Sequence, residues 1–552
     1  MIFPQIPLAQ SIIQICLAKG LRDIIICPGS RNAPLTIGFA NNPGFTCYSI
    51  ADERCAAFFA LGIAQQKKKP VAVVCTSGSA LLNFYPAFAE AFYSQIPLVV
   101  ISADRPKDKI DIGDGQTIRQ QNVFENHSVY NANLTADASP ENDLKINEAI
   151  NASFLHQGPV HINAPFEEPL YETTSEPVVD PAIKPVKNRA RKLAPNDVIV
   201  YSNIWNTKSK KMILIGVNEP DELSSEILTR FAEDPSVVVF TETTSNILHS
   251  NFIGNIDRII TPCNDADFEE LRPQILITLG GMVVSKRIKT FLRTFKPLHH
   301  WHIDPLRAYD TYGSLSKHFQ VSPHEFFTQL LPFAKPLKST YQQHVTKIRN
   351  DRAKKHDKFF QAAVFSDFKA YGVILPALPH GIQLHVGNSA AIRYAQLFDI
   401  DQSIKVFSNR GTSGIDGSTS TAIGAAIGSS RPAVIITGDI SFFYDSNALW
   451  NSYIPKNFKI IVVNNGGGGI FRILPGHREN DVFNTFFETS HCLTAEHLAR
   501  MYKFKYFTAS DESTLTENLS VFLNENTQPA ILEVFTPTRI NDKVLADYFR
   551  QL

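Results

Sequence analysis

The chain has 552 residues, of which 44% are hydrophobic and 19% charged, a composition typical of globular rather than disordered proteins. Lys and Arg together number 53, as do Asp and Glu, so the net charge gives no reason to expect a nucleic-acid partner. No apolar run approaches the roughly 20 residues that a membrane helix needs, so no membrane span is expected. At about 100–200 residues per domain, the length predicts three or four domains.

The cysteines and the N-terminus bear on the compartment. The seven cysteines are scattered without a CxxC pair, and Cys27 and Cys75 lie in apolar runs. This pattern favours buried free thiols in a reducing compartment. The first 20 residues lack the basic segment and the small-residue cleavage site of a signal peptide. We therefore expect a soluble, cytoplasmic protein.

The first part of the chain alternates short β-branched runs with longer helical stretches, the pattern of a parallel α/β sheet. Strands are predicted at residues 23–27, 71–75, 98–102 and 160–163, and helices at 8–18 and 79–93. A polar, Pro-rich stretch without periodicity follows from Glu167 to about Asn196 and is typical of a linker.

The same alternation recurs twice after the linker. In the second part the strand-like runs are MILIGV, SVVVF, QILITL and HHWHI, and a charged helical segment near 341–360 leads into the third part. There, strands are predicted at 383–386, 405–407, 433–436, 460–463 and 530–535. We therefore predict three doubly wound α/β domains, at 1–180, 195–335 and 345–552. In such sheets, ligands bind at the carboxyl ends of the strands.

Polar residues follow two apolar strands of the third predicted domain. The run AVIIT ends in Gly438-Asp439, and KIIVV ends in Asn464-Asn465, followed by four glycines. Carboxylate and amide oxygens are ligands for Mg²⁺, which usually completes its shell with phosphate oxygens, and glycines let the backbone approach a phosphate. Either half alone would more often be an ordinary turn, but the pair at this spacing favours a metal and phosphate site.

This pair is similar to the GD…NN signature of thiamine diphosphate (ThDP) enzymes. The resemblance implies Mg²⁺ ligands at Asp439, Asn465 and the carbonyl of Gly467, with Gly438 beside the cofactor. It also implies that Glu53 is the catalytic glutamate on the aminopyrimidine ring. By itself, Glu53 would favour a carboxylate at a helix N-terminus, and only together with Asp439 and Asn465 does it favour catalysis. The resemblance further assigns cofactor contacts to Ile415, as the apolar wedge beneath the bent cofactor, and to Thr76 and Gln116.

Further motifs resemble one family of ThDP enzymes, the 2-succinyl-5-enolpyruvyl-6-hydroxy-3-cyclohexene-1-carboxylate synthases of menaquinone biosynthesis. The match spans all three predicted domains and rests on CPGSRNAPL (27–35), ADER (51–54), TSGSALLNFYPAFAEA (76–91), ADRP (103–106), GQTIRQ (115–120), SKR (285–287), GNSAAIR (387–393), SNRGTSGIDG (408–417) and NNGGGGIF (464–471). Gly115 departs from the family, which often has Asn at this position.

The substrates of this family, 2-oxoglutarate and isochorismate, are both dicarboxylates. A site for four carboxylates needs several arginines, whose planar guanidinium suits carboxylates better than an ammonium does. The resemblance implies polar substrate contacts from Ser30, Arg31, Arg105, Lys286, Arg287, Ser389, Arg393 and Arg410, and an apolar wall from Ile470, Phe471 and Leu474. For any one arginine alone, a surface ion pair is as good an interpretation.

The expected enzyme is a transferase that decarboxylates 2-oxoglutarate and adds the succinyl carbanion to isochorismate in a 1,4 fashion. Because the superfamily binds its cofactor between the first domain of one subunit and the third of another, a homodimer or a dimer of dimers is expected. The alternatives are another ThDP carboligase of the acetolactate synthase type, a 2-oxoacid decarboxylase, or a non-catalytic relative. A Rossmann dehydrogenase is disfavoured, since no GxGxxG follows an early strand.

Overall fold

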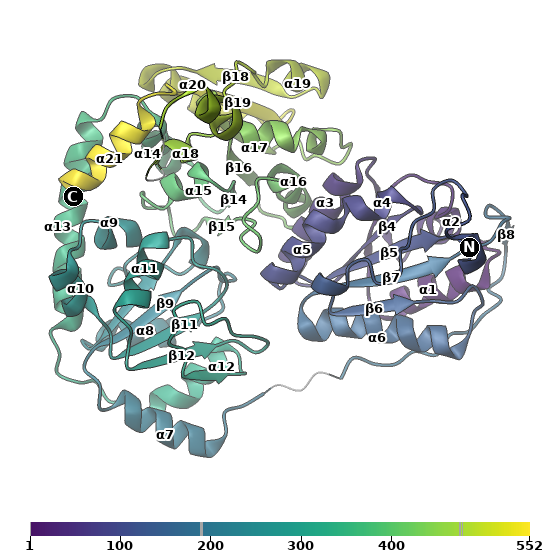
Figure 1. Ribbon diagram of the computed structural model, residues 1–552, viewed down its shortest axis with the longest axis horizontal. Coiled ribbons are helices and arrows are strands. Elements are labelled where there is room, and N and C mark those ends of the chain that lie inside the picture. The colour runs from purple at the N-terminus through teal and green to yellow at the C-terminus, as the bar shows by residue number, and fades with distance from the viewer. Residues whose placement is uncertain (1, 188–190, 474–475, 477) are drawn as a thin grey trace.

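A computed structural model describes residues 2–187, 191–473, 476 and 478–552. Three parallel sheets, each with helices on its faces, follow one another along the chain (Figure 1). The prediction of an α/β protein with three parallel sheets is confirmed. Among the helices of the described ranges, none is both long and apolar enough to cross a membrane.

The first sheet has six strands in the order β3-β2-β4-β5-β7-β6. Its elements are α1 (Pro7–Ala18), β2 (Asp23–Ile26), α2 (Ala33–Ala40), β3 (Thr46–Ser49), α3 (Glu53–Lys67), β4 (Val71–Cys75), α4 (Ser79–Asn83), α5 (Tyr85–Ser94), β5 (Leu98–Asp104), β6 (Tyr130–Asn133), α6 (Pro140–His156) and β7 (Pro159–Pro165). Two short strands, β1 (Phe3–Pro4) and β8 (Thr173–Thr174), pair antiparallel beside it.

In this sheet, the structure differs from the sequence prediction in one helix and in one strand at the edge. The single helix predicted at 79–93 is two helices, because Pro86 lies in the first turn of α5 and has no N–H to continue α4. Strand β6 was not predicted. It is an edge strand, and its sequence YNAN lacks the apolar run of a central strand.

The middle sheet has five strands in the order β10-β9-β11-β12-β13. Its elements are α7 (Pro195–Trp205), β9 (Lys211–Ile215), α8 (Ser225–Glu233), β10 (Val237–Thr241), α9 (Ile256–Ile260), α10 (Asp265–Leu271), β11 (Ile275–Leu279), α11 (Lys286–Thr294), β12 (His299–Ile303), β13 (Lys317–Phe319), α12 (Pro323–Leu330) and the long α13 (Tyr341–Ala362). The short edge strand β13 was not predicted.

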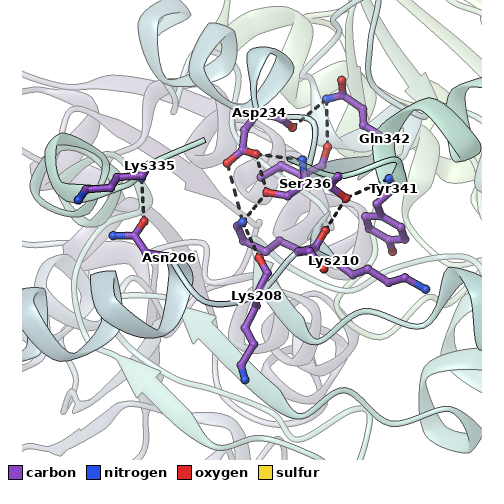
Figure 2. A network of polar contacts seen from close by, with 12 residues as sticks. Asn206, Lys208, Lys210, Asp234, Ser236, Lys335, Tyr341 and Gln342 are labelled. Atoms are coloured by element: carbon purple, nitrogen blue, oxygen red, sulfur yellow. Dashed lines mark hydrogen bonds and ion pairs between the residues drawn. The ribbon is translucent and has the colours of Figure 1, made fainter. Parts of the chain in front are cut away.

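A polar network at the amino ends of β9 and β10 anchors α13 to the middle sheet (Figure 2). Gln342 at the start of α13 donates to the carbonyl of Val237 at 3.0 Å and to that of Asp234 at 3.3 Å. Below them, the buried Lys211 Nζ lies 3.8 Å from Asp234 Oδ2 and donates to the carbonyl of Lys208 at 2.9 Å. Burial lowers the pKa of Lys211 to about 8. The network therefore fixes the direction in which the chain leaves the middle sheet.

The third sheet has six strands in the order β15-β14-β16-β17-β19-β18. Its elements are α14 (Asp367–Ala377), β14 (Gln383–Val386), α15 (Ala390–Ala395), β15 (Lys405–Phe407), α16 (Ser418–Gly428), β16 (Ala433–Gly438), α17 (Asp439–Tyr444), β17 (Lys459–Asn464), α18 (Ile470–Ile473), α19 (Glu496–Met501), β18 (Lys505–Ala509), α20 (Glu512–Asn524), β19 (Ala530–Phe535) and α21 (Asn541–Gln551). As expected from the GD…NN pair, β16 and β17 are neighbours, and Gly438 is in register with Val463.

We call each sheet with its helices a unit. Helices α3 and α16 join the first and third units into one apolar core (Figure 1). Their backbones approach so closely that a Cβ at Gly62 would lie 2.0 Å from the carbonyl oxygen of Thr421. On the opposite helix, a Cβ at Gly424 would lie 2.0 Å from the carbonyl oxygen of Phe59. Only glycine fits at these two crossings.

Candidate active site

Asp439 organises the turn that follows β17. It is the first residue of α17, and its side chain is almost fully buried. Its Oδ2 accepts hydrogen bonds from the backbone N–H groups of Gly466 at 2.9 Å and Gly467 at 3.0 Å, while its Oδ1 accepts from the N–H of Ile440 at 2.7 Å. One carboxylate thus holds the glycine turn against the end of the neighbouring strand.

Asn465 lies beside Asp439 in this turn. Its Nδ2 donates to Asp367 Oδ2 at 3.0 Å, and its own backbone carbonyl accepts from Thr538 Oγ1 at 2.6 Å. Its Oδ1 is buried and has no hydrogen-bond partner among the described residues. A buried amide oxygen without a partner is costly unless a ligand satisfies it, so this atom indicates a binding site.

The segment that packs on the glycine turn comes from farther along the chain. Gly466 accepts from the N–H of His491 at 3.0 Å, and Gly468 donates its N–H to the carbonyl of Glu488 at 2.6 Å. Arg472 Nη2 donates to Glu488 Oε2 at 2.6 Å, and both side chains are buried. His491 Nε2 lies 3.4 Å from Asp439 Oδ2, and that contact raises the pKa of His491. These contacts restrain the turn between β17 and α18.

Two loops at the carboxyl ends of β14 and β15 are joined by Asn388. Its Nδ2 donates to the carbonyl of Asn409 at 2.7 Å and to that of Gly414 at 2.6 Å, and its Oδ1 accepts from Arg410 Nη1 at 2.7 Å. The next residue in the second loop, Ile415, accepts a bond from Ser441 of α17 at 2.8 Å through its carbonyl. The predicted wedge Ile415 is therefore tied to the helix that Asp439 begins.

Glu90 connects this loop to the first unit of the same chain. It is buried on α5, where its carboxylate accepts from the N–H groups of Gly411 and Thr412, each at 2.7 Å.

Burial lowers the pKa of Arg410 and the nearby Arg393 lowers it further, while Glu242 acts in the opposite direction. Arg410 is thus a desolvated cation whose Nε has no partner among the described residues.

A cavity of about 880 Å³ opens where the middle and third units meet. Several predicted substrate residues line it, namely Lys286, Arg287, Arg393 and Ile470. Its wall continues along α21, with Asp542, Lys543 and Arg550. This volume suits a small molecule, and its lining combines cations with apolar side chains.

Lys286 and Arg287 owe their position to buried carboxylates of the middle unit. Glu242 accepts from the N–H groups of Val284 at 2.7 Å and Ser285 at 2.8 Å, which fixes the turn into α11. Burial raises the pKa of Glu242 to about 7. The Ser285 hydroxyl in turn donates to Asp257. These hydrogen bonds hold the turn from which Lys286 and Arg287 project.

The predicted site residues of the first unit lie outside the lining of this cavity. Glu53 begins α3, and burial raises the pKa of its half-buried carboxyl. Its neighbours contact the third unit of the same chain: Asp52 Oδ2 accepts from Asn447 at 2.8 Å, and Arg54 donates to the carbonyl of Tyr444 at 2.8 Å. Tyr444 ends α17, whereas Asp439 begins it. These contacts place the start of α3 at the far end of α17.

Arg31 and Thr76 adjoin at the carboxyl ends of β2 and β4. The N–H of Arg31 donates to Thr76 Oγ1 at 3.3 Å, and its guanidinium lies 3.0 Å from Glu168. Arg105, after β5, donates to the carbonyl of Gly115 at 3.3 Å, and the backbone of Gln116 packs on Gly78. The exposed Ser30 precedes Arg31. These residues form one group at the edge of the first sheet, apart from the cavity above.

The remaining predicted residues lie in the third unit. Ser389 lies at the N-cap position of α15 with a φ of +68° and makes no capping hydrogen bond with its side chain, and Phe471 follows Ile470 in α18. Leu474 lies outside the described residues. The sequence prediction missed Asp367, Asn388, Glu90 and Glu242. Glu90 alone offered a signal, as the one charged residue in the otherwise apolar YPAFAEAFYS.

Comparison with protein families supports a cofactor site at these two sheets. Residues 6–129 match the N-terminal TPP binding domain of thiamine pyrophosphate enzymes, and residues 386–534 match the C-terminal TPP binding domain. Thiamine pyrophosphate is another name for ThDP. The first segment contains Glu53 and Arg31, and the second contains Asp439 and Asn465, whereas Lys286 and Arg287 lie between the two segments.

Similarity to curated proteins extends over the whole chain. A 2-succinyl-5-enolpyruvyl-6-hydroxy-3-cyclohexene-1-carboxylate synthase of Flavobacterium johnsoniae is 65% identical, and one of Flavobacterium psychrophilum is 64% identical, each over 100% of both chains. A protein of the same name from Bacteroides thetaiotaomicron is 36% identical over 97% of both chains.

Proposed function

Because the chain belongs to the family of ThDP-dependent 2-succinyl-5-enolpyruvyl-6-hydroxy-3-cyclohexene-1-carboxylate synthases, we propose that it joins 2-oxoglutarate, with loss of CO₂, to isochorismate in menaquinone biosynthesis. It is thus a transferase, and its three sheets correspond to working domains at 1–180, 195–335 and 345–552. The cavity in which Lys286, Arg287 and Arg393 converge carries the substrate part of this proposal.

The third sheet suits ThDP held through Mg²⁺. Within the described ranges, no group of three or more His, Cys, Asp or Glu could hold a metal, so the metal set draws on amide and main-chain oxygens. The Asp439 carboxylate, the unpartnered Asn465 Oδ1 and the carbonyl of Gly467 supply oxygens of the kind that Mg²⁺ prefers. Gly438 leaves room beside them, since a Cβ there would meet no atom within 4 Å.

When bound, ThDP supplies the reactive carbon and the electron sink for decarboxylation. Glu53 would exchange a proton with the pyrimidine ring of the bound cofactor, and its raised pKa suits that exchange. Ile415 would support the cofactor from below, and Thr76 and Gln116 would bind it from the first unit. Ile470 and Phe471 would form an apolar wall that excludes water from the reacting carbons.

The basic residues bind the substrate carboxylates. Arg393 and Arg410 have guanidinium Nε atoms that are buried without a partner among the described residues, so each retains a donor for a carboxylate. Lys286 and Arg287 bring positive charge from the middle unit. Ser389 would add a polar contact at the start of α15. Ser30, Arg31 and Arg105 lie apart from the cavity within one chain, so they would reach the substrates from the first unit of a second copy. This amount of positive charge favours two dicarboxylates over the uncharged side chains handled by acetolactate synthase-like enzymes.

The working unit is a homodimer or a dimer of dimers. Within one chain, the start of α3 contacts Tyr444 and Asn447, at and just beyond the end of α17 opposite to Asp439. A second chain that brings its Glu53 to the Asp439 turn completes the cofactor site, in line with an isologous assembly.

Product analysis tests the activity. The purified protein is incubated with ThDP, Mg²⁺, 2-oxoglutarate and isochorismate, and the expected product is the succinylated cyclohexene carboxylate. A non-catalytic relative gives no product. A preference for pyruvate over 2-oxoglutarate contradicts the substrate assignment and leaves another ThDP carboligase.

Arg410 provides a sharper test of substrate choice. If it binds the distal carboxylate of 2-oxoglutarate, Arg410→Ala should cost roughly 2–5 kcal/mol in kcat/KM, the range for breaking a desolvated charge pair. Pyruvate, which lacks that carboxylate, should be a poor substrate and should lose less. Arg410→Lys is the matched control, because it keeps the charge and loses the planar guanidinium. Arg393→Ala is tested in parallel, and unchanged 2-oxoglutarate kinetics in both alanine variants refutes the assignment.

A further inference from the structure

The metal ligand assigned to Asn465 has a buried carboxylate behind it. We propose that Asp367 is a positioning residue that orients the Asn465 amide, so that its oxygen faces Mg²⁺. This inference rests on the proposed metal site and concerns a residue outside the GD…NN motif.

An amide side chain has two chemically different ends, and its neighbours decide which end points where. Asn465 Nδ2 lies 3.0 Å from Asp367 Oδ2. An ionised carboxylate only accepts hydrogen bonds, so it attracts the NH₂ end of the amide and repels the oxygen. Turning the amide around would place two oxygens at that distance. Asp367 therefore fixes Asn465 Oδ1 on the opposite side, where it is buried without a partner among the described residues.

Asp367 itself is held by three hydrogen bonds to its neighbours. Thr536, just after β19, donates its hydroxyl to Asp367 Oδ1 at 2.5 Å. The backbone N–H of Asp367 donates to Asn541 Oδ1 at 2.8 Å. Each carboxylate oxygen thus has a protein donor, Thr536 on one and Asn465 on the other. Asp367 therefore acts through Asn465 rather than as a ligand of its own.

The preorientation has a thermodynamic consequence. Without Asp367, the Asn465 amide can rotate, and metal binding has to select the one orientation in which the oxygen points inward. The NH₂ group also loses a charge-assisted hydrogen bond. Both effects weaken the metal site and leave the direct contacts of ThDP with the protein intact.

Calorimetry of ThDP binding over a series of Mg²⁺ concentrations tests the inference. Asp367→Ala should raise the Mg²⁺ concentration for half-maximal ThDP binding by roughly 10-fold or more, the effect of losing a hydrogen bond to a charged group. Asp367→Asn should recover much of this loss, because its amide oxygen accepts the same bond. Asp367→Ser replaces the alanine variant if that protein does not fold, with the same expected shift.

Thr536→Val is the matched control. It removes the hydrogen bond from the Thr536 hydroxyl to the Asp367 carboxylate and leaves the bond between Asp367 and Asn465. The Mg²⁺ requirement of this variant should therefore stay within about 3-fold of wild type. Thermal unfolding of each cofactor-free protein records any general loss of stability separately. Equal shifts in Thr536→Val and Asp367→Ala would assign Asp367 a purely structural role and overturn the inference.

The wild-type protein separates the two levels of the proposal. If its ThDP binding does not depend on Mg²⁺, the metal site fails and the inference fails with it. If wild-type binding needs Mg²⁺ and Asp367→Ala needs no more of it, the inference alone is overturned and the metal site stands.

Discussion

Two opposing effects act on the charge of the Glu53 carboxylate. It is the first residue of α3, where the helix dipole stabilises negative charge. Burial acts against that charge and raises the pKa of Glu53, with the adjacent Asp52 adding to the effect. A residue needed only to begin the helix would not need this partial burial, because Asp52 already caps α3 through a 2.9 Å bond from the N–H of Cys55.

We therefore expect Glu53→Gln to lower kcat by about 100-fold or more, the usual contribution of a positioned acid or base. The affinity for ThDP should change little, because the substitution keeps the shape of the side chain. Steady-state kinetics and calorimetry measure the two quantities on the same protein. Asp52→Ala is the control for helix capping, and if it matches Glu53→Gln in kcat, Glu53 has only a role at the helix start.

At the scale of elements, the crossing of α3 and α16 sets how the first unit meets the third. Glycines at the crossing let the two backbones touch, at Gly62 on one helix and Gly424 on the other. Local helix propensity favours alanine over glycine by about 1 kcal/mol, so the glycines weaken each helix by itself. Their presence is explained by the tertiary contact, which leaves no room for a methyl group.

This contact decides whether replacing Gly62 by alanine stabilises or destabilises the protein. Gly62→Ala should destabilise the protein by about 1–3 kcal/mol or more through overpacking against the backbone of Thr421, in spite of its better helix propensity. Denaturant unfolding followed by circular dichroism measures the change in midpoint. Gly115→Ala is the control, since a Cβ at Gly115 meets no atom within 4 Å, and it should be close to neutral. A stabilised Gly62→Ala protein would contradict the close approach of α3 and α16.

At the scale of the whole molecule, the active site depends on how three units share one chain. The cations of the cavity come from the middle and third units, whereas Glu53 and Arg31 lie in the first. Within the chain, α3 contacts the end of α17 remote from Asp439. The proposed dimer brings the first unit of another copy to the Asp439 turn.

A hybrid dimer tests the proposal that two chains share each cofactor site. Glu53→Gln and Asp439→Ala should each inactivate the homodimer. When the two variants are co-expressed with different tags and the hybrid dimer is purified, one of its two sites contains an intact Glu53 and an intact Asp439. It should regain about half of the wild-type activity per dimer. An inactive hybrid would place both residues of each site within a single chain.

The sequence by itself determined the parallel α/β architecture, most central strands and the GD…NN pair. Central strands bury both faces and therefore carry continuous apolar runs, such as AVIIT and KIIVV, that are visible without a structure. The edge strands β6, β13 and β18 were not predicted, because they lack such continuous apolar runs. The resemblance drawn from short motifs identified the family, which full-length similarity bears out. The roles of individual site residues stay predictions.

Only the tertiary structure decided which residues support the site. Asp367 lies far from Asn465 in the chain and reaches it because α14 begins beside the ends of β17 and β19. Glu90 likewise meets the loop at Gly411 only because the first and third units pack together. A buried carboxylate in an apolar helix shows in the sequence that some partner must exist, but the partner depends on long-range packing. The physical reason is that hydrogen bonds are set by distance in space, and local sequence patterns record only the secondary structure around each residue.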